Sequence, residues 1–126
     1  MASFAVSANQ NYTFDCQAIT TVAATTTSTH WNISVPASPT KFNAIIQEYT
    51  TVGAGASDFI GLCTGTTASC SQTTSGSGVI AGMPNFVNGR LINGANAGVI
   101  NVTFRTEVNA AAVTLVTGSY CVMYNE

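Results

Sequence analysis

The chain has very little charge. Asp, Glu, Lys and Arg make up 6% of its 126 residues, whereas a typical globular domain has about 25%. The basic residues are Lys41, Arg90 and Arg105, scattered along the sequence. Because nucleic-acid binding needs several basic side chains to neutralise phosphates, we expect no nucleic-acid partner. We expect no membrane partner either, since anionic lipid surfaces attract clustered Lys and Arg.

Long apolar runs and helix-forming residues are also scarce. Without about eighteen consecutive apolar residues, the sequence predicts no transmembrane helix. Residues 1–16 lack the basic and apolar regions of a secretory signal, so we expect synthesis in the cytoplasm. Leu occurs only at positions 62, 91 and 115, and no apolar pattern keeps a helical spacing. The sequence therefore argues against a helical fold.

Residues that carry catalysis or bind metals are few. His30 is the only histidine, and no Cys or second His lies at the spacing of a zinc site. A Ser-His-Asp arrangement would have to combine His30 with Asp15 or Asp58, but the G-x-S-x-G sequence that presents such a serine is absent. The carboxylates form no calcium-loop pattern. We therefore predict no enzymatic activity, no catalytic residues, no cofactor and no metal site.

Thr, Val, Ile and aromatic residues are abundant, and they alternate with polar residues as in half-buried β-strands. About eight short strands separated by polar turns predict an all-β protein: a single antiparallel β-sandwich domain over residues 1–126, expected to be a jelly roll. The expected strand segments are 12–14, 18–24, 30–35, 41–52, 58–65, 78–82, 85–94, 100–107 and 112–124.

Turn residues punctuate these segments. The pairs Asn88-Gly89 and Asn93-Gly94 are the strongest turn signals, because Asn and Gly both tolerate positive φ. The last segment is predicted to be a hairpin around Gly118-Ser119. Its Tyr120, Val122 and Tyr124 are expected on one face, with Cys121 and Met123 on the other. The stretch 64–78 is low in complexity and is predicted to be an exposed loop.

The four cysteines allow three connectivities, between which the sequence does not choose. Cys63 and Cys70 bracket a short segment that a disulfide would close. Cys16 and Cys121 lie near opposite ends of the chain, and they would meet if the first and last strands were neighbours. Cytoplasmic synthesis favours free thiols, whereas a later extracellular life would allow both disulfides.

Arg105 and Glu107 lie two residues apart on an expected strand, and therefore on one face. In a chain with so little charge, this pair could fix the register across a subunit interface. The alternative, a solvated surface pair that contributes at most ~1 kcal/mol, stays open.

The segments VTFRTEV (102–108) and AAVTLVTGSYCVMY (111–124) resemble the closing strands of small jelly-roll structural proteins of tailed bacteriophages. These are the head decoration (cement) proteins and the trimeric, tumour-necrosis-factor-like tips of fibres. The resemblance implies a homo-oligomer, with a trimer favoured. It implies a partner in the major capsid protein or another virion protein, a location in the virion and no enzymatic activity.

We therefore expect a capsid decoration subunit that stabilises the particle through protein–protein contacts. One alternative is a carbohydrate-binding or adhesin domain, in which Trp31 and the tyrosines would stack on sugar rings. Another is a self-assembling pilus or filament subunit, in which the apolar segment 2–6 would add as a strand to a neighbouring subunit.

Overall fold

The structure is a computed structural model that describes residues 1–22, 29–49, 58–66, 69–73, 83–106 and 112–126. Within these ranges the chain forms strands and no helix, so none of the described segments is a helix that could span a membrane. The strands are β1 (Ala2–Val6), β2 (Asn11–Val22), β3 (Thr29–Ser34), β4 (Lys41–Tyr49), β5 (Asp58–Gly65), β6 (Ser69–Thr73), β7 (Met83–Ile92), β8 (Gly98–Thr106), β9 (Val113–Leu115) and β10 (Tyr120–Asn125).

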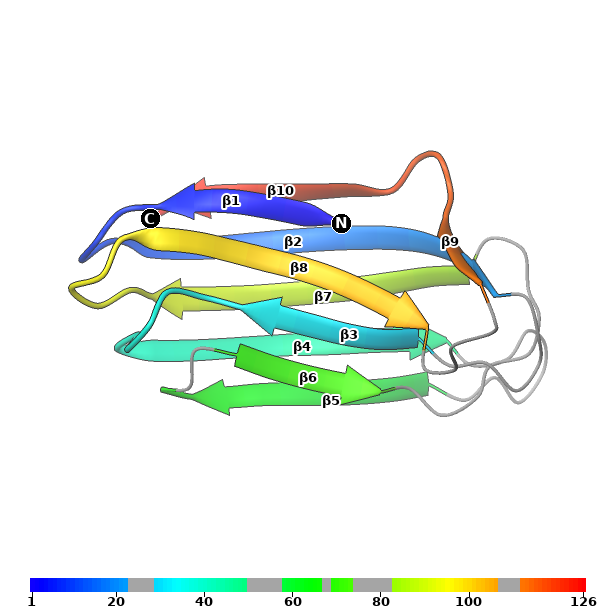
Figure 1. Cartoon of the computed structure of the whole chain (residues 1–126), viewed down its shortest axis with the longest axis horizontal. Helices are drawn as coiled ribbons and strands as arrows, with labels where there is room; N and C mark the ends of the chain where they lie inside the picture. The colour runs from blue at the N-terminus through cyan, green and yellow to red at the C-terminus, as the bar shows by residue number, and fades with distance from the viewer. Residues whose placement is uncertain (23–28, 50–57, 67–68, 74–82, 107–111) are drawn as a thin grey trace.

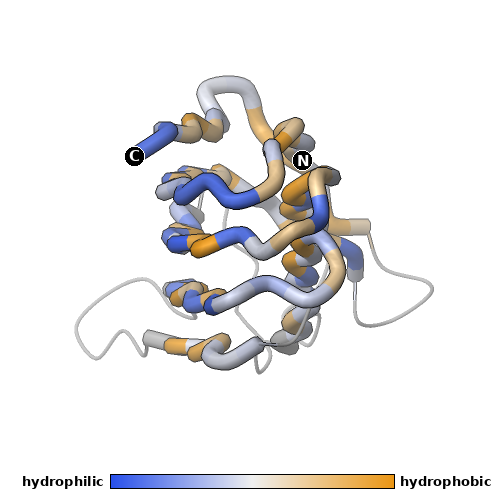
Figure 2. The backbone as a smooth tube through the Cα atoms, turned by 90° about the vertical axis from the view of Figure 1, so that its left-hand side faces the viewer, coloured by the Kyte–Doolittle hydropathy of each residue, from blue (hydrophilic) through white to orange (hydrophobic). Residues whose placement is uncertain are grey.

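The strands form two antiparallel sheets that pack face to face (Figures 1 and 2). The four-stranded sheet has the order β1-β8-β3-β6. The six-stranded sheet has the order β10-β2-β7-β4-β5, and β9 also pairs with β2. The predicted all-β antiparallel sandwich is therefore confirmed.

Strict alternation along the strands builds the core between the sheets. Every second residue of β2 is buried, from Tyr12 to Val22, because successive side chains of a strand point to opposite faces. Trp31 of β3 is fully buried, and its ring centroid lies 5.5 Å from that of Phe104 on β8. The other fully buried large apolar side chains are Phe14, Phe42, Ile33, Ile46, Leu91, Ile100, Val87 and Val102.

The turn predicted at Asn88-Gly89 is wrong, because both residues lie inside the continuous strand β7. Gly89 pairs with Phe14 of β2. A Cβ atom on Gly89 would lie 2.1 Å from Cζ of Phe14. The glycine therefore makes room for a buried aromatic ring. The other predicted turn does follow β7, where the Asn93 side-chain amide donates to the carbonyl oxygens of Ser7 and Asn96.

The hairpin predicted around Gly118-Ser119 is also wrong. β9 and β10 do not pair with each other, since both run antiparallel to β2 and follow one another along it. Between them, the Val116 amide donates to the carbonyl of Ile19, and the Ile19 amide donates to the hydroxyl of Ser119. These bonds bridge the interruption, so the two short strands act as one broken edge strand. The predicted faces of β10 are correct, because Tyr120 and Tyr124 are exposed whereas Cys121 is half-buried.

The stretch 64–78, predicted as a loop, contains β6, which pairs with β3. Hydroxyl-rich sequence can form an edge strand when a neighbouring strand supplies the ladder, and Cys70 ties this segment to Cys63 of β5. The strand expected at 78–82 lies outside the described residues.

Candidate functional site

Most of the large apolar side chains that are exposed to solvent lie on the outer face of the six-stranded sheet. Cross-strand pairing aligns outward side chains of five strands into rows: one of them runs Val122, Asp15, Asn88, Ile45 and Leu62. The two ends of this row are apolar and its centre is polar. The flanking rows differ from it, since the row from Tyr124 to Thr64 is apolar at one end only, and the row from Tyr120 to Ile60 carries Phe86 at its centre.

One apolar group lies at the β4/β5 end of this face. Ile45, Ile60 and Leu62 are 46%, 64% and 61% exposed. They lie next to a hollow of about 480 Å³ that Ile45 and Leu62 line together with Asp15, Asn88 and other residues of the face. Adjacent exposed aliphatic side chains of this kind typically mark a protein–protein contact.

The other apolar group lies on β10, at the opposite end of the face. Tyr120, Val122 and Tyr124 are 53%, 36% and 57% exposed and point to the same side of the strand. The rings present both a flat apolar surface and a hydroxyl, a combination that is enriched in interfaces.

Between these groups, polar and charged side chains hydrogen-bond to one another. The Asn88 amide donates to the Asp15 carboxylate at 2.7 Å. Arg90 forms an ion pair with Glu126, at 2.6 Å between Nη2 and Oε2, and Thr13 also donates to Glu126. The hydrogen bonds from Arg90 and then Thr13 lower the pKa of the Glu126 carboxyl below its ordinary value. The Arg90–Glu126 ion pair compensates its own charges, and the Asp15 carboxylate remains as one negative charge on this part of the face.

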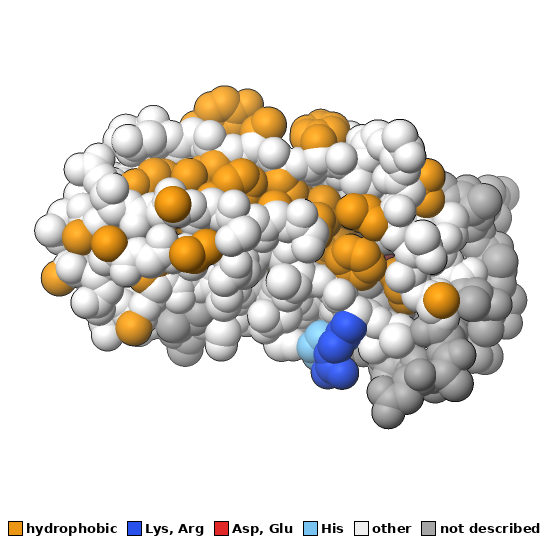
Figure 3. All heavy atoms as spheres, turned by 45° about the horizontal axis from the view of Figure 1, so that its top comes forward, with side chains coloured by type: hydrophobic (Ala, Val, Ile, Leu, Met, Phe, Trp, Pro, Cys, Tyr) orange, Lys and Arg blue, Asp and Glu red, His pale blue; other side chains and the backbone are white. Residues whose placement is uncertain are grey.

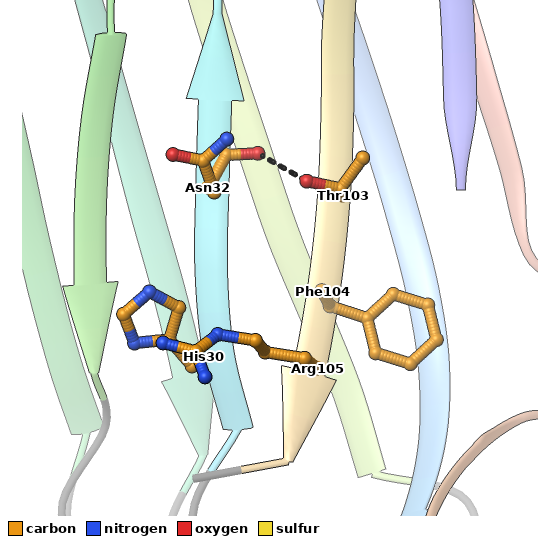
Figure 4. A pocket seen from close by; sticks show the side chains of 5 residues that line it. All are labelled: His30, Asn32, Thr103, Phe104 and Arg105. Carbon is orange, nitrogen blue, oxygen red and sulfur yellow. Dashed lines mark hydrogen bonds between the residues drawn. The ribbon is translucent and has the colours of Figure 1, made fainter.

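The outer face of the four-stranded sheet is more polar, although Val99 is exposed on it. Ser3 donates to the Asn101 side chain at 2.9 Å, and Asn101 donates to the Ser34 hydroxyl at 3.3 Å. Thr103 donates to the backbone carbonyl of Asn32 (Figure 4). The hydroxyls and amides are thus engaged with each other across the strands.

Arg105 and His30 lie on this polar face, opposite one another on β8 and β3. They line a hollow of about 340 Å³, across which the Arg105 side chain extends toward His30 (Figure 4). His30 also shares a hydrogen bond with the hydroxyl of Ser71. Glu107, the expected partner of Arg105 at an interface, lies outside the described residues. The structure therefore places Arg105 on the surface without testing that pair.

The residues weighed for catalysis are not brought together. His30 faces outward from the four-stranded sheet and Asp15 outward from the six-stranded sheet, on opposite faces of the molecule. Asp58 belongs to β5, in the sheet that does not contain His30. Among the described residues, no three His, Cys, Asp or Glu side chains are grouped so that they could hold a metal ion.

One buried carboxylate was not foreseen from the sequence. Glu48 is 2% exposed, and the Trp31 indole N–H donates to its Oε2 at 3.2 Å. The signal was available, because Glu48 keeps the same alternation as Phe42, Ala44 and Ile46 on β4. This hydrogen bond joins the two sheets inside the core, so Glu48 is a structural residue rather than part of a surface site.

The structure pairs all four cysteines. Cys63 of β5 bonds to Cys70 of β6, which joins the two sheets at one edge of the sandwich. Cys16 of β2 bonds to Cys121 of β10 within the six-stranded sheet. The second disulfide fastens the edge strand that carries the exposed tyrosines.

Comparison of the chain with protein-family models, with curated proteins and with solved structures finds no match.

Proposed function

We propose that this protein is a non-enzymatic structural subunit of a virion, a capsid decoration protein that stabilises the particle through protein–protein contacts. The observation that carries the proposal is the outer face of the six-stranded sheet. It bears exposed aliphatic side chains at Ile45, Ile60 and Leu62, next to a shallow hollow that Ile45 and Leu62 help to line. Many copies, each making a modest contact of this kind, would together reinforce a particle strongly.

The strand order supports the jelly-roll part of the proposal. In a jelly roll, eight successive strands are divided between two sheets in the orders 1-8-3-6 and 2-7-4-5. The orders β1-β8-β3-β6 and β2-β7-β4-β5 agree with this scheme, and β9 and β10 add an edge beside β2. Small structural proteins of tailed bacteriophages, which the closing strands resemble, use the same scheme.

The low charge supports self-association and a protein partner. A net charge of −2 provides little repulsion between copies or against a capsid. We propose the major capsid protein or another virion protein as the partner, and further copies of this chain as neighbours on the particle.

The test is co-sedimentation with capsids of the virus that encodes this chain. We expect the wild-type protein to pellet with the particles and Leu62→Glu to remain in the supernatant, because a carboxylate would be desolvated in the contact. The matched control is Thr103→Glu, which places the same charge on the exposed polar face and is expected to bind normally. Loss of binding in the control alone, or a wild-type protein that ignores the particles, would refute the proposal.

Carbohydrate binding is a second candidate function, with the tyrosines of β10 but without Trp31. Trp31 is fully buried, so it cannot stack on a sugar ring, and that part of the hypothesis is wrong. Tyr120 and Tyr124 remain exposed on one face of β10, about 13 Å apart at the usual rise of a strand. A glycan array in which wild-type binding disappears with Tyr124→Ala would favour this function over capsid decoration.

The filament hypothesis would require the segment 2–6 to leave the sheet of its own chain. Ala2–Val6 forms β1 and pairs with β8 of its own chain. Donating this segment to a neighbouring subunit would therefore break its pairing with β8.

A further inference from the structure

The backbone of β10 alternates between bonding to β2 and facing outward. The Glu126 amide donates to the carbonyl of Asn11 at 3.0 Å. The two residues therefore form a hydrogen-bonded pair, and in an antiparallel ladder such pairs recur at every second residue. By this alternation, the even-numbered residues from 120 to 126 bond to β2, and the odd-numbered residues of β10 direct their N–H and C=O groups to the other side.

The disulfide on this strand agrees with the alternation. The Cα atoms of Cys16 and Cys121 are 4.0 Å apart, the close spacing of a pair without hydrogen bonds. The outward backbone groups thus belong to Cys121, Met123 and Asn125, and no other strand of the described chain pairs with this side of β10.

In the part of the chain that the structure describes, this edge lacks the features that usually prevent strands from pairing with other molecules. Edges are commonly protected by charged side chains, by proline or by a covering segment. From Tyr120 to Asn125 the strand contains no charged residue and no proline. Its exposed side chains are Tyr120, Val122 and Tyr124, which are favourable in strands.

We propose that β10 pairs antiparallel with β10 of a second copy of this chain, about a two-fold axis at Met123. In this register Met123 lies opposite Met123 of the second copy, and Cys121 lies opposite Asn125. The three hydrogen-bonded pairs give about six backbone hydrogen bonds. A pairing centred on Cys121 would instead use Ser119, whose amide is already bonded to the carbonyl of Val116.

The side chains favour a second copy over an unrelated strand. The proposed register places Val122 of each copy directly opposite Tyr124 of the other on the outer face, an aromatic and β-branched pair that stabilises sheets. Because β10 itself is uncharged, bringing two identical strands together opposes no like charges. The symmetric pairing is self-complementary, as a two-fold interface requires.

The neighbouring surface extends this interface. A hollow of about 280 Å³ lies between β1 and β10, lined in part by Met1, Phe4, Leu115 and Tyr120. Figure 3 shows hydrophobic side chains gathered in a band on this side of the molecule. A second copy seated on β10 would cover part of this band and remove apolar surface from water.

The inference rests on the proposed function only in identifying copies of the chain as neighbours, and it is tested on the full chain with both disulfides intact. Met123→Pro removes one outward N–H and no hydrogen bond to β2, and proline is tolerated where the strand N–H faces solvent. By sedimentation equilibrium, we expect a wild-type dimer and a monomeric variant. Met123→Leu keeps the N–H and is expected to remain dimeric. A wild-type monomer, the trimer that the resemblance to phage proteins favours, or an undiminished Met123→Pro dimer would overturn the inference.

A second measurement needs no substitution. In a dimer mixed from isotope-labelled and unlabelled chains, the α-protons of Val122 and Tyr124 belong to a close pair across the two-fold axis. We expect a nuclear Overhauser effect between them that crosses from one chain to the other. A dimer without this signal would overturn the register, even if Met123→Pro failed to fold.

The outcomes separate this inference from the proposed function. A dimer formed through β10 in a protein that ignores capsids would retain the inference and refute the decoration role. A protein that binds capsids through Leu62 but does not pair through β10 would do the reverse.

Discussion

The two edges of the sandwich are completed in different ways. At one edge, β5 and β6 belong to different sheets, and the Cys63–Cys70 disulfide joins them. At the other edge, β1 and β10 also belong to different sheets and lie side by side (Figure 1), but the Cys16–Cys121 disulfide runs from β10 to β2 within one sheet. In the part of the chain that the structure describes, no disulfide links the two sheets there.

The difference indicates a division of roles between the edges. At the β5/β6 edge, which we call the closed edge, a disulfide holds the two sheets together. This edge therefore stabilises the single chain and needs no partner molecule. At the β1/β10 edge, which we call the open edge, the disulfide holds β10 in register with β2 but does not join β10 to β1. A strand that is fastened on one side and unpaired on the other is well prepared to receive a partner, because little ordering is left to do on binding.

The comparison predicts that losing the disulfide at the open edge has the larger effect on stability. Cys16 and Cys121 are separated by 105 residues, and on the chain-entropy model a loop of about that length contributes ~4–5 kcal/mol. We expect Cys16→Ala with Cys121→Ala to lower the free energy of unfolding by about this amount in urea titrations followed by circular dichroism. A loss smaller than that produced by removing the other disulfide would contradict the chain-entropy account.

Removing the disulfide at the closed edge should have a smaller and more local effect. Cys63 and Cys70 are seven residues apart, which corresponds to ~2–3 kcal/mol on the same model. We expect Cys63→Ala with Cys70→Ala to increase hydrogen exchange in β6 and leave β10 protected. Faster exchange in β10 would show that the two edges are not independent.

Much of the fold could be predicted because alternation is a local property. The sequence around Trp31 and from Ile100 to Phe104 states which side chains face inward, and the structure agrees. Gly89 misled the prediction, because its function is to accommodate Phe14, a contact between positions far apart in the sequence. Gly118 misled it similarly, since only the pairing of both flanking strands with β2 shows that the chain continues in one direction.

The candidate surface was harder to predict, because it depends on register between distant strands. Ile45, Leu62 and Val122 share one row only after β10, β2, β7, β4 and β5 are placed side by side. Each of these residues alone is an ordinary apolar position in a strand. Arg105 was a candidate interface residue because charged residues are rare in this chain. The scarcity of a residue type does not show what its side chain contacts.

The smallest expected effect concerns the end of the open edge. Arg90 and Thr13 hydrogen-bond the Glu126 carboxylate and lower its pKa below the ordinary value of 4.5. Because the folded pKa is the lower one, the contribution of Glu126 is present above pH 4.5 and is lost as the pH falls through the folded value. The carboxylate is exposed to solvent and screened, so we expect local fraying next to Asn125 rather than unfolding.

Titration of the Glu126 side chain by carbon NMR measures this directly. The midpoint is expected below the ordinary value in the wild-type protein and closer to it in Arg90→Gln. The Glu126 amide bonds to Asn11, and its protection relative to the intrinsic exchange rate at each pH should decrease as the pH falls through this range. If the midpoint does not move in the variant, the ion pair does not form in solution. The end of β10 would then be held by its backbone hydrogen bonds and the Cys16–Cys121 disulfide, and the open edge would owe its order to these alone.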